Sequence, residues 1–466
     1  MRPRAARGAP ISQQAPPLVS GSDPCPCTQG GAVQKTRLRT AGVVGALALT
    51  LVLSGCSSSD SDSAGGGGGG SATMKFWGWS PGYADAVKAF NKSHPDIKVE
   101  YQEVQPGAKG GYQKMLNAVQ ADNAPCLAQV GYETLPSFAA QGALQDVAKY
   151  AEGDKGDFQK AAWNSVSLGG AVYGAPVDTG PMALFYNKKV YDDLDLKPPK
   201  TWAEYAKQAK KIHASDPKRY ISSPYLNYDY AGLSWQAGAS WFGIKGDAWQ
   251  VDLASAAGKK VADYWQGLAD DGLISKAPMY DQAWYSGLGS GNIATVVGAV
   301  WQAGVIKGGA KDGSGDWAVA PMPQWAAGDT PVGNAGGSAT AVLKGCESTE
   351  AAWTFAHWLS TDREAYGGLV DKASLYPAAP ALLDLPQLKA GDPYFGGQKI
   401  YDVFAAAAPK VSSDWTWGPV MTKTSADLDD ALSKAWAGKG TIADALRGTQ
   451  DKTVSELKNQ GLTVAD

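Results

Sequence analysis

The chain has 466 residues, of which 42 are Lys or Arg and 45 are Asp or Glu, so its formal net charge is −3. This length exceeds one comfortable hydrophobic core, and two domains are expected for the part that folds. No Lys/Arg cluster lies beyond residue 55, which argues against nucleic acid or anionic lipid as a main partner.

The first recognisable element lies near the N-terminus. A basic segment at 35–39 precedes an apolar run at 41–53, and small residues follow the run. This order is typical of a secretory signal, and the run is too short to span a bilayer stably. Its ending, Leu53-Ser54-Gly55-Cys56, resembles a bacterial lipobox, in which the cysteine is lipidated and becomes the first mature residue. The alternative is an ordinary secreted protein with a chance cysteine near the cleavage site.

The sequence after this cysteine favours the lipobox. Residues 57–63 are polar, and Gly65 to Gly70 are all glycine. We therefore expect a signal region at 1–55, a lipidated flexible tether at 56–72, and an extracytoplasmic lipoprotein held at the outer face of the cell membrane through Cys56.

The segment before the signal is unusual for a targeting sequence. Residues 1–32 are rich in Pro, Gly and Arg and show no apolar periodicity. Signal peptides normally begin near their basic segment. We therefore expect the true start of translation to lie downstream, at Val33 read from an alternative start codon.

Removal of residues 1–55 changes the charge and the cysteine count. That segment holds six of the 42 basic residues and one of the 45 acids, so 36 and 44 remain and the net charge becomes −8. With Cys56 assigned to lipid, only Cys126 and Cys346 are left. An even pair in an oxidising compartment allows one disulfide, and the alternative is two buried free thiols. The three histidines have no metal-ligand spacing, so no metal or other cofactor is expected.

The mature chain begins with alternating strands and helices. A short strand at 74–77 is followed by a helix at 83–93 and by a strand at 97–101 that alternates apolar and polar residues. A second helix at 112–120 precedes a buried strand at 127–130. This alternation favours an α/β sheet with helices on both faces.

Later segments are richer in helix. The capping box Thr201-Trp202-Ala203-Glu204 opens a helix that is expected to run to about His213. Further helices are predicted at 350–359 and over most of 425–459. The mature chain holds all 17 Trp against 9 Phe, and Trp and Tyr combine a flat apolar face with a polar tip. Because sugar rings have the same mixed character, this composition weakly favours a carbohydrate ligand.

Three groups of segments carry a more specific signal. They are Phe90 to Val99, Leu168 to Pro176 with Leu184 to Lys188, and Gly336 to Val342 with the helix after it. The middle group contains a glycine-flanked Tyr-Gly-x-Pro turn and a strand that ends in Tyr-Asn-Lys. In this order after a lipobox, the segments resemble the family 1 extracellular solute-binding proteins of bacterial carbohydrate ABC transporters. The resemblance covers essentially the whole mature chain.

The resemblance implies an α/β fold with two domains, a type II periplasmic-binding-protein clamp like that of maltose-binding protein. The ligand cleft would lie between the domains, which close around the ligand by a hinge motion. Prolines near the expected crossings, at 176–181, 321–323 and 376–377, suit stiff hinges. The expected segments are 73–178 plus 322–376 for domain I, and 179–321 plus 377–466 for domain II.

The resemblance also bears on the two remaining cysteines. The family usually has Pro-Asp-Val at the third strand, where this chain has Pro125-Cys126-Leu127. In the family's sheet this strand runs antiparallel to the one carrying Ser338 to Leu343, so the start of one meets the end of the other. A disulfide between Cys126 and Cys346 is therefore expected.

Cleft residues in such a clamp come from loops at strand ends. Trp79 lies in a glycine-proline loop after the first strand and is expected to be a platform for a sugar ring. Glu133 follows the third strand, either as an acceptor for sugar hydroxyls or as an acid at a helix N-terminus. Asp178 and Thr179 sit at the first expected hinge, as ligand contacts or as hinge structure.

Other candidates lie further along the chain. Gly336 and Gly337 would let the backbone approach the ligand, with Ser338 offering a hydroxyl. The family often has an aromatic residue facing the cleft near the position of Trp301. The remaining candidates are aromatic or basic residues in loops or near glycines: Trp235, Trp241, Trp284, Arg363, Tyr376, Trp415 and Trp417. Of Trp235 and Trp241, one is expected to stack on the ligand and the other to pack.

These observations favour a non-catalytic, monomeric receptor. It would capture a mono- or oligosaccharide and deliver it to the permease subunits of an ABC transporter. One alternative is a surface lipoprotein glycoside hydrolase, for which no motif pairs two carboxylates. The other is a binder of the same fold for a polyamine, a metal or phosphate. The lack of a histidine cluster disfavours metal, and the lack of basic candidates apart from Arg363 disfavours phosphate.

Overall fold

The computed structural model describes residues 72–465. The signal region, the alternative start at Val33, Cys56 and the glycine tether lie outside the described residues, and their interpretation stays a prediction. Within the described part, no helix combines the length and the apolar character that a membrane crossing requires.

An eight-stranded mixed sheet forms the framework. Its main order is β10-β6-β11-β3-β1-β2, and β9 and β12 also pair with β6. β1 is parallel to β2 and β3, whereas β11 is antiparallel to β3 and to β6. The strands are β1 Ala72–Gly78, β2 Ile97–Glu103, β3 Leu127–Gly131, β6 Gly174–Asn187, β9 Thr295–Ala299, β10 Trp317–Ala320, β11 Asn334–Val342 and β12 Tyr376–Pro377.

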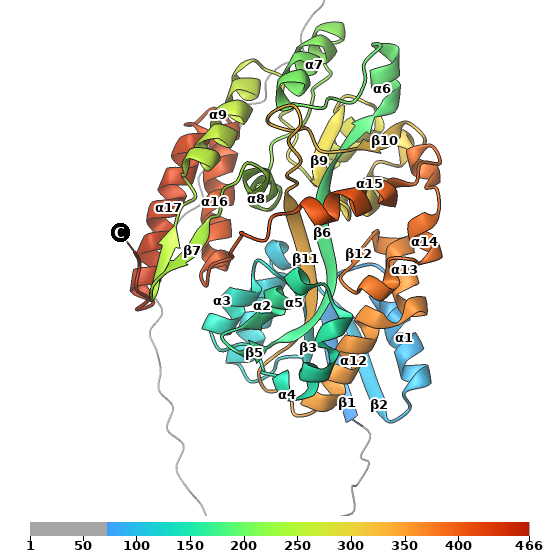
Figure 1. The fold of residues 1–466 in the computed structure, drawn as a ribbon, viewed down its shortest axis with the longest axis vertical. Helices are drawn as coiled ribbons and strands as arrows, with labels where there is room; N and C mark the ends of the chain where they lie inside the picture. Colours follow the sequence, from blue (N-terminus) through green and yellow to red (C-terminus); the bar gives the residue numbers. More distant parts are fainter. Residues whose placement is uncertain (1–71, 466) are drawn as a thin grey trace, which may run out of the picture. The chain divides into compact units, whose positions relative to one another are not determined.

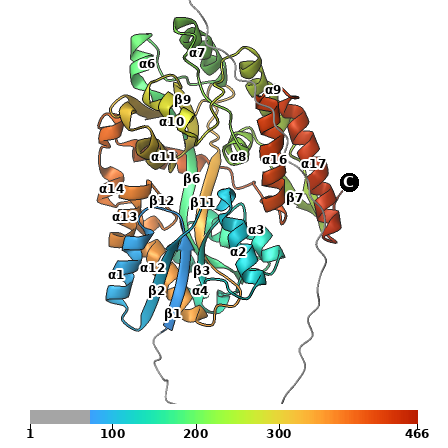
Figure 2. The same ribbon diagram turned by 180° about the vertical axis from the view of Figure 1, so that it is seen from behind.

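The long strand β6 connects two lobes. Its first half pairs with β11, and its second half pairs with β9 and β10. Figure 1 shows β1, β2 and β3 on one side and β9 and β10 on the other, with β6 and β11 running between them; Figure 2 gives the view from behind. We call the part around β1–β3 the first lobe and the part around β9 and β10 the second lobe.

Helices surround both lobes. In the first lobe α1 packs on β2 and α12 packs on β6 and β11, while in the second lobe α15 packs on β6 and β10. The α-helices are α1 Tyr83–Ser93, α2 Gly111–Gln120, α3 Leu135–Ala140, α4 Ala148–Ala151, α5 Lys160–Val166, α6 Lys188–Asp193, α7 Trp202–Ser215, α8 Asn227–Gln236, α9 Ala256–Asp270, α10 Gln282–Gly289, α11 Gln302–Gly309, α12 Thr349–Thr361, α13 Arg363–Ala373, α14 Pro386–Lys389, α15 Ile400–Ala407, α16 Met421–Trp436 and α17 Ile442–Asn459. Two short hairpins complete the fold, β4 Ser167–Leu168 with β5 Ala171–Val172, and β7 Phe242–Lys245 with β8 Ala248–Val251.

The local signals in the sequence match the observed elements closely. The helix predicted at 83–93 is α1, and the strand predicted at 127–130 lies within β3. At the capping box, the Thr201 hydroxyl accepts from the Glu204 N–H at 3.2 Å. The Glu204 carboxylate reaches one residue further back than expected and accepts from the Lys200 N–H at 2.7 Å. The helix continues to Ser215, two residues beyond the expected end.

The two cysteines are joined by a disulfide, which is the pairing that the resemblance implied. Leu127 of β3 pairs with Val342 of β11 in antiparallel register, which brings the start of one strand beside the end of the other. Cys126 and Cys346 flank these positions, and their Cα atoms lie 4.5 Å apart. This separation is within the range that a disulfide can bridge.

Candidate functional site

A cavity of about 550 Å³ lies between the two lobes. On the first lobe its wall comes from the loops after β1, β2 and β3, and on the second lobe from the start of α8, from α11 and from Tyr280. Because β1, β2 and β3 are parallel, their carboxyl ends meet at one edge of the sheet, which is where α/β proteins bind ligands. We call this cavity the cleft.

Aromatic rings from both lobes line the cleft. In the first lobe Trp79 meets Tyr112 edge to face, with ring centroids 5.8 Å apart. In the second lobe Tyr228 and Trp301 lie 6.1 Å apart, and the indole N–H of Trp301 donates to the Ala335 carbonyl at 2.8 Å. The cleft therefore presents flat apolar faces on opposite walls.

Glu133 brings a buried carboxylate to the first-lobe wall. It lies between β3 and α3, and its Oε1 accepts from the hydroxyls of Tyr112 at 2.8 Å and Thr134 at 3.2 Å. Its Oε2 has no hydrogen-bond partner among the described residues. Burial raises the pKa of Glu133, and the hydrogen bonds from the Tyr112 and Thr134 hydroxyls partly offset this effect.

Asp229 brings a second buried carboxylate, from the first turn of α8 in the second lobe. Its Oδ2 accepts from the Tyr280 hydroxyl at 2.8 Å, whereas its Oδ1 has no partner in the described part of the chain. Burial raises the pKa of Asp229 to about 6. Each lobe thus contributes a cleft-lining residue that carries one buried, unpaired acceptor oxygen, although buried polar atoms are normally hydrogen-bonded.

Asp178 and Ser338 form the base of the cleft, where β6 and β11 cross between the lobes. The Asp178 Oδ1 accepts from the Ser338 N–H at 2.9 Å and from its hydroxyl at 2.7 Å. Burial raises the pKa of Asp178 to about 7, and the two hydrogen bonds from Ser338 oppose this rise. This bonding gives Asp178 a structural role in holding the two strands together.

Gln129 positions the loop that carries Trp79. This buried side chain accepts from the N–H groups of Trp79 at 3.0 Å and Ser80 at 3.2 Å, and it donates to the Ser80 hydroxyl at 2.8 Å. Gln129 was not among the predicted site residues, although a polar residue inside the otherwise apolar strand at 127–130 is a usable signal.

The glycines at 336 and 337 serve the packing of tyrosine rings. Both have left-handed backbone conformations, with φ of 95° and 100°. A Cβ on Gly337 would lie 2.4 Å from the ring of Tyr132, and one on Gly336 would lie 2.6 Å from the Tyr228 hydroxyl. Gly337 lines the cleft and Gly336 does not.

Four of the predicted tryptophans gather in a cluster outside the cleft lining. Trp235 and Trp415 stack with ring centroids 4.8 Å apart and an interplanar angle of 7°, and Trp241 and Trp417 pack around them. Trp241 is fully buried, and the Trp235 indole donates to the Ser412 carbonyl at 3.0 Å. The structure thus brings these residues to one another and not to the other candidates.

The remaining predicted residues also lie outside the lining. Thr179 pairs with Tyr376 between β6 and β12. Trp284 is buried behind the second-lobe wall and packs against Tyr280 and Tyr285. Arg363 is exposed and donates to the carboxylate of Asp384 at 2.7 Å.

The sequence candidates that the structure gathers at the cleft are therefore a subset. They come from the loops after β1 and β3, from the strands β6 and β11, and from the start of α11: Trp79, Glu133, Asp178, Trp301, Gly337 and Ser338. The cleft residues that were not predicted from the sequence include Gln129 and four residues from α2, from the start of α8 and from the loop before α10: Tyr112, Tyr228, Asp229 and Tyr280. They also include charged residues, so the expectation that Arg363 is the main basic candidate was wrong: Lys109, Lys372 and Asp429.

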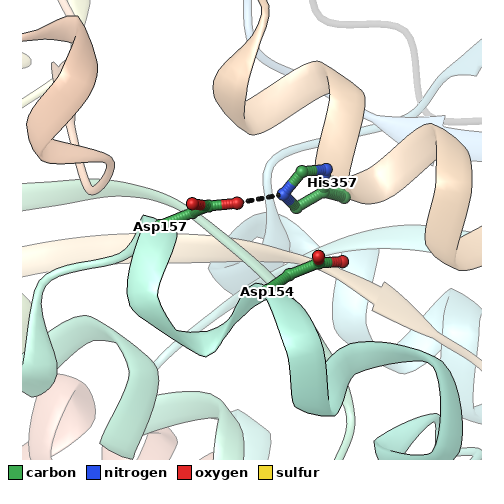
Figure 3. A group of neighbouring side chains, drawn as sticks. All are labelled: Asp154, Asp157 and His357. Atoms are coloured by element: carbon green, nitrogen blue, oxygen red, sulfur yellow. Dashed lines mark hydrogen bonds and ion pairs between the residues drawn. The ribbon is translucent and has the colours of Figure 1, made fainter.

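A separate group of side chains, drawn in Figure 3, lies in the first lobe, and none of its members lines the cleft. The ligand-type atoms of Asp154, Asp157 and His357 are within 4.8 Å of one another. Internal hydrogen bonds account for this grouping, because His357 Nε2 bonds to Asp157 at 2.8 Å and Asp154 accepts from the Trp353 indole at 2.8 Å.

Comparison with known proteins shows which family this chain resembles. The family described as "Bacterial extracellular solute-binding protein" matches residues 79–366. The solved structure of the galacto-N-biose-/lacto-N-biose I-binding protein from Bifidobacterium longum, in complex with lacto-N-biose, is 33% identical, covers 85% of this chain and 99% of that chain, and gives a TM-score of 0.77.

The descriptions of two further relatives also refer to sugars. The binding protein from B. animalis subsp. lactis Bl-04, solved in complex with beta-1,6-galactobiose, is 29% identical over 84% of this chain and 99% of its own, with a TM-score of 0.77. The arabinooligosaccharide-binding protein of Bacillus subtilis is 26% identical over 66% of this chain and 73% of its own length. The fold is that of the two-domain sugar-binding clamps.

Proposed function

Because the chain belongs to the bacterial extracellular solute-binding protein family, we propose that it captures a sugar or oligosaccharide in the cleft and delivers it to an ABC transporter permease. The relatives compared above are named as binding proteins, and this supports a receptor over an enzyme. Their family places the chain outside the cytoplasm.

The observation that carries the sugar proposal is the chemistry of the cleft walls. Glu133 and Asp229 line the cleft, and their unpaired oxygens, which are buried in this structure, would each accept a hydrogen bond from a ligand hydroxyl once the lobes open to admit the ligand. The rings of Trp79 and Trp301, from opposite lobes, can contact the C–H faces of a sugar. A neutral, polyhydroxylated ring satisfies both requirements at once.

A glycoside hydrolase is the second candidate, and one observation favours it. Hydrolysis uses two carboxylates, one of which has a raised pKa, and the cleft holds Glu133, Asp178 and Asp229. The names of the relatives argue for binding alone, so any test of sugar binding should also measure bond cleavage.

The location proposal rests on the N-terminal sequence. We propose that Cys56 is lipidated and that the glycines at 65–70 form a tether, which would hold the receptor near its permease and raise its effective concentration there. We further propose a monomer, with domain I formed by 73–178 plus 322–376 and domain II by 179–321 plus 377–466.

A thermal-shift panel tests the function. The purified chain from residue 72 onward is heated with lacto-N-biose, β-1,6-galactobiose, lactose, maltotriose and arabino-oligosaccharides, and with spermidine, phosphate and glucuronate as non-sugar or acidic comparisons. A bound ligand raises the melting temperature by mass action.

We expect at least one neutral sugar to raise the melting temperature, with no reducing sugar released in the same wells. Release of reducing sugar would show that the protein is a hydrolase and not a receptor. A response to spermidine or phosphate, with none to any sugar, would overturn the ligand class.

A further inference from the structure

A second hollow lies on the second lobe, in a groove between α10 and α11. Its volume is about 720 Å³, and it runs along both helices to Lys311 and Asp312 beyond the end of α11. The two helices pack against each other, and their labels lie next to each other in Figure 2. We call this hollow the α10–α11 groove.

The groove adjoins the cleft. Tyr285, Gly304 and Val305 line both spaces and form the boundary between them. Each space alone has the size of a small-molecule site. A ligand that extends beyond the cleft on this side would pass over Tyr285 and meet the groove directly.

The lining of the groove has the mixed character that suits a sugar unit. The half-buried ring of Tyr285 lies directly over Gly309, where a Cβ would come within 2.0 Å of the ring. Gly304 and Gly308 are one turn apart on α11, so the floor beside this ring is bare backbone. Polar side chains stand at the rim, among them Gln282, Ser286 and Asp312.

We infer that the bound ligand is an oligosaccharide longer than a disaccharide, with one end in the cleft and its further units in the α10–α11 groove. This inference rests on the proposed sugar-binding function and specifies the chain length and the side on which the ligand leaves the cleft. Tyr285 then contacts the ligand where the cleft meets the α10–α11 groove.

The substitution Gly308→Trp tests the inference, because it fills the groove and leaves the cleft lining unchanged. Gly308 is exposed on α11, no atom lies within 4 Å of its Cβ position, and a helical glycine tolerates replacement well. Gly267→Trp is the matched control, since Gly267 is also exposed, helical and free of neighbours, but lies on α9 outside both compartments.

Calorimetric titration would use β-1,6-galacto-oligosaccharides, arabino-oligosaccharides and malto-oligosaccharides of two to five units. In the unmodified protein we expect the affinity within the accepted series to rise at least tenfold between two and four units. In Gly308→Trp this gain should disappear while the disaccharide affinity stays the same, and Gly267→Trp should behave like the unmodified protein.

The inference fails if the disaccharide binds as tightly as the longer sugars, or if Gly308→Trp leaves the gain intact. Either result leaves the proposed sugar-binding function unaffected. If no sugar of the three series binds and no sugar in the thermal-shift panel raises the melting temperature, the proposed function itself is wrong. If Gly308→Trp does not fold, Ser286→Trp on the opposite side of the groove replaces it.

Discussion

The unpaired oxygens of Glu133 and Asp229 are the residue-scale feature that links stability to binding. A buried acceptor without a hydrogen bond costs roughly 1–3 kcal/mol, and a buried carboxylate costs more than a neutral group. A ligand hydroxyl at each oxygen would recover part of that cost. The free protein is therefore less stable than it would be if these two oxygens were hydrogen-bonded, and they belong to residues that are expected to bind the ligand.

Substitution of Glu133 by Gln should change stability and affinity in opposite directions. The amide oxygen can still accept from Tyr112, but the unpaired acceptor becomes an NH₂ donor. We expect a higher melting temperature and a sugar affinity that is weaker by roughly 10- to 100-fold, the equivalent of one hydrogen bond to a charged group. Thermal unfolding and calorimetric titration measure the two effects. The exposed Glu347→Gln is the control, and unchanged affinity in Glu133→Gln would remove this residue from the site.

Removal of the Trp79 ring should weaken binding without unfolding the protein. Trp79 is only partly buried, and the loop that carries it is held through its backbone N–H by Gln129, which the substitution Trp79→Ala leaves in place. We expect roughly a tenfold loss of affinity, or about 1.4 kcal/mol. Trp249→Ala removes another part-buried indole, which lies outside the cleft, and should bind normally. Equal affinities in the two variants would contradict the role of Trp79.

Sequence reasoning found the cleft residues that follow strands and missed those that depend on tertiary packing. Trp79 and Glu133 could be selected because parallel strands bring their ends together. Asp229 and Tyr280 could not, because they meet only through packing of α8 against a loop some 50 residues away. Trp235 and Trp415 look like cleft residues in the sequence, yet they stack on each other because composition does not reveal which aromatic faces find partners.

At the scale of elements, the buried carboxylate of Asp178 adds a side-chain link to the pairing of β6 and β11 where the two strands pass between the lobes. Asp178 has a pKa of about 7 in the folded protein, against an ordinary value of 3.8. The folded state therefore keeps a proton that the unfolded chain has already lost between these pH values. Folding takes up this proton, so the free energy of unfolding contributed by Asp178 falls as the pH rises from about 4 to about 7.

The substitution Asp178→Asn should remove this dependence. The amide oxygen can still accept from the Ser338 N–H and hydroxyl but does not titrate. Denaturant unfolding between pH 4.5 and 8 should show the variant gaining stability relative to the unmodified protein as the pH rises. The exposed Asp402→Asn should show no such trend. A constant difference between Asp178→Asn and the unmodified protein across this range would contradict the assignment.

The elements themselves were predictable where a local signal existed. The capping box at Thr201 gave the start of α7, and apolar periodicity gave α1. Gly336 and Gly337 were predicted to let the backbone approach the ligand, and the side chains packed against them were not foreseen. They accommodate the rings of Tyr228 and Tyr132 respectively, and contacts of this kind, between segments far apart in the chain, leave no local pattern.

For the whole molecule, the placement of the two carboxylates on different lobes has a mechanical consequence. A ligand that satisfies both Glu133 and Asp229 is bonded to the first and the second lobe at once, and its differential affinity favours the arrangement in which they are closest. The framework for such a motion is present in β6 and β11, which pass between the lobes.

The proposed lipid anchor can be tested in cells. If Cys56 is lipidated, metabolic labelling with a palmitate analogue should mark the protein, and Cys56→Ser should abolish the label and release the protein from the membrane fraction. Cys126→Ser is the matched control, because its sulfur is engaged with Cys346 and cannot carry lipid. An unlabelled protein, or a Cys56→Ser variant that keeps its label, would contradict the lipobox interpretation.

Ligand-driven closure should be visible in solution. We expect the radius of gyration, measured by small-angle X-ray scattering on the chain from residue 72 onward, to fall when the sugar identified by thermal shift is added. A sugar that gives no thermal shift should leave it unchanged. In Asp229→Asn the second-lobe acceptor becomes a donor, so ligand that still binds at high concentration should no longer close the lobes fully. Equal compaction in this variant and in the unmodified protein would show that the bridge between the two carboxylates does not drive the closure.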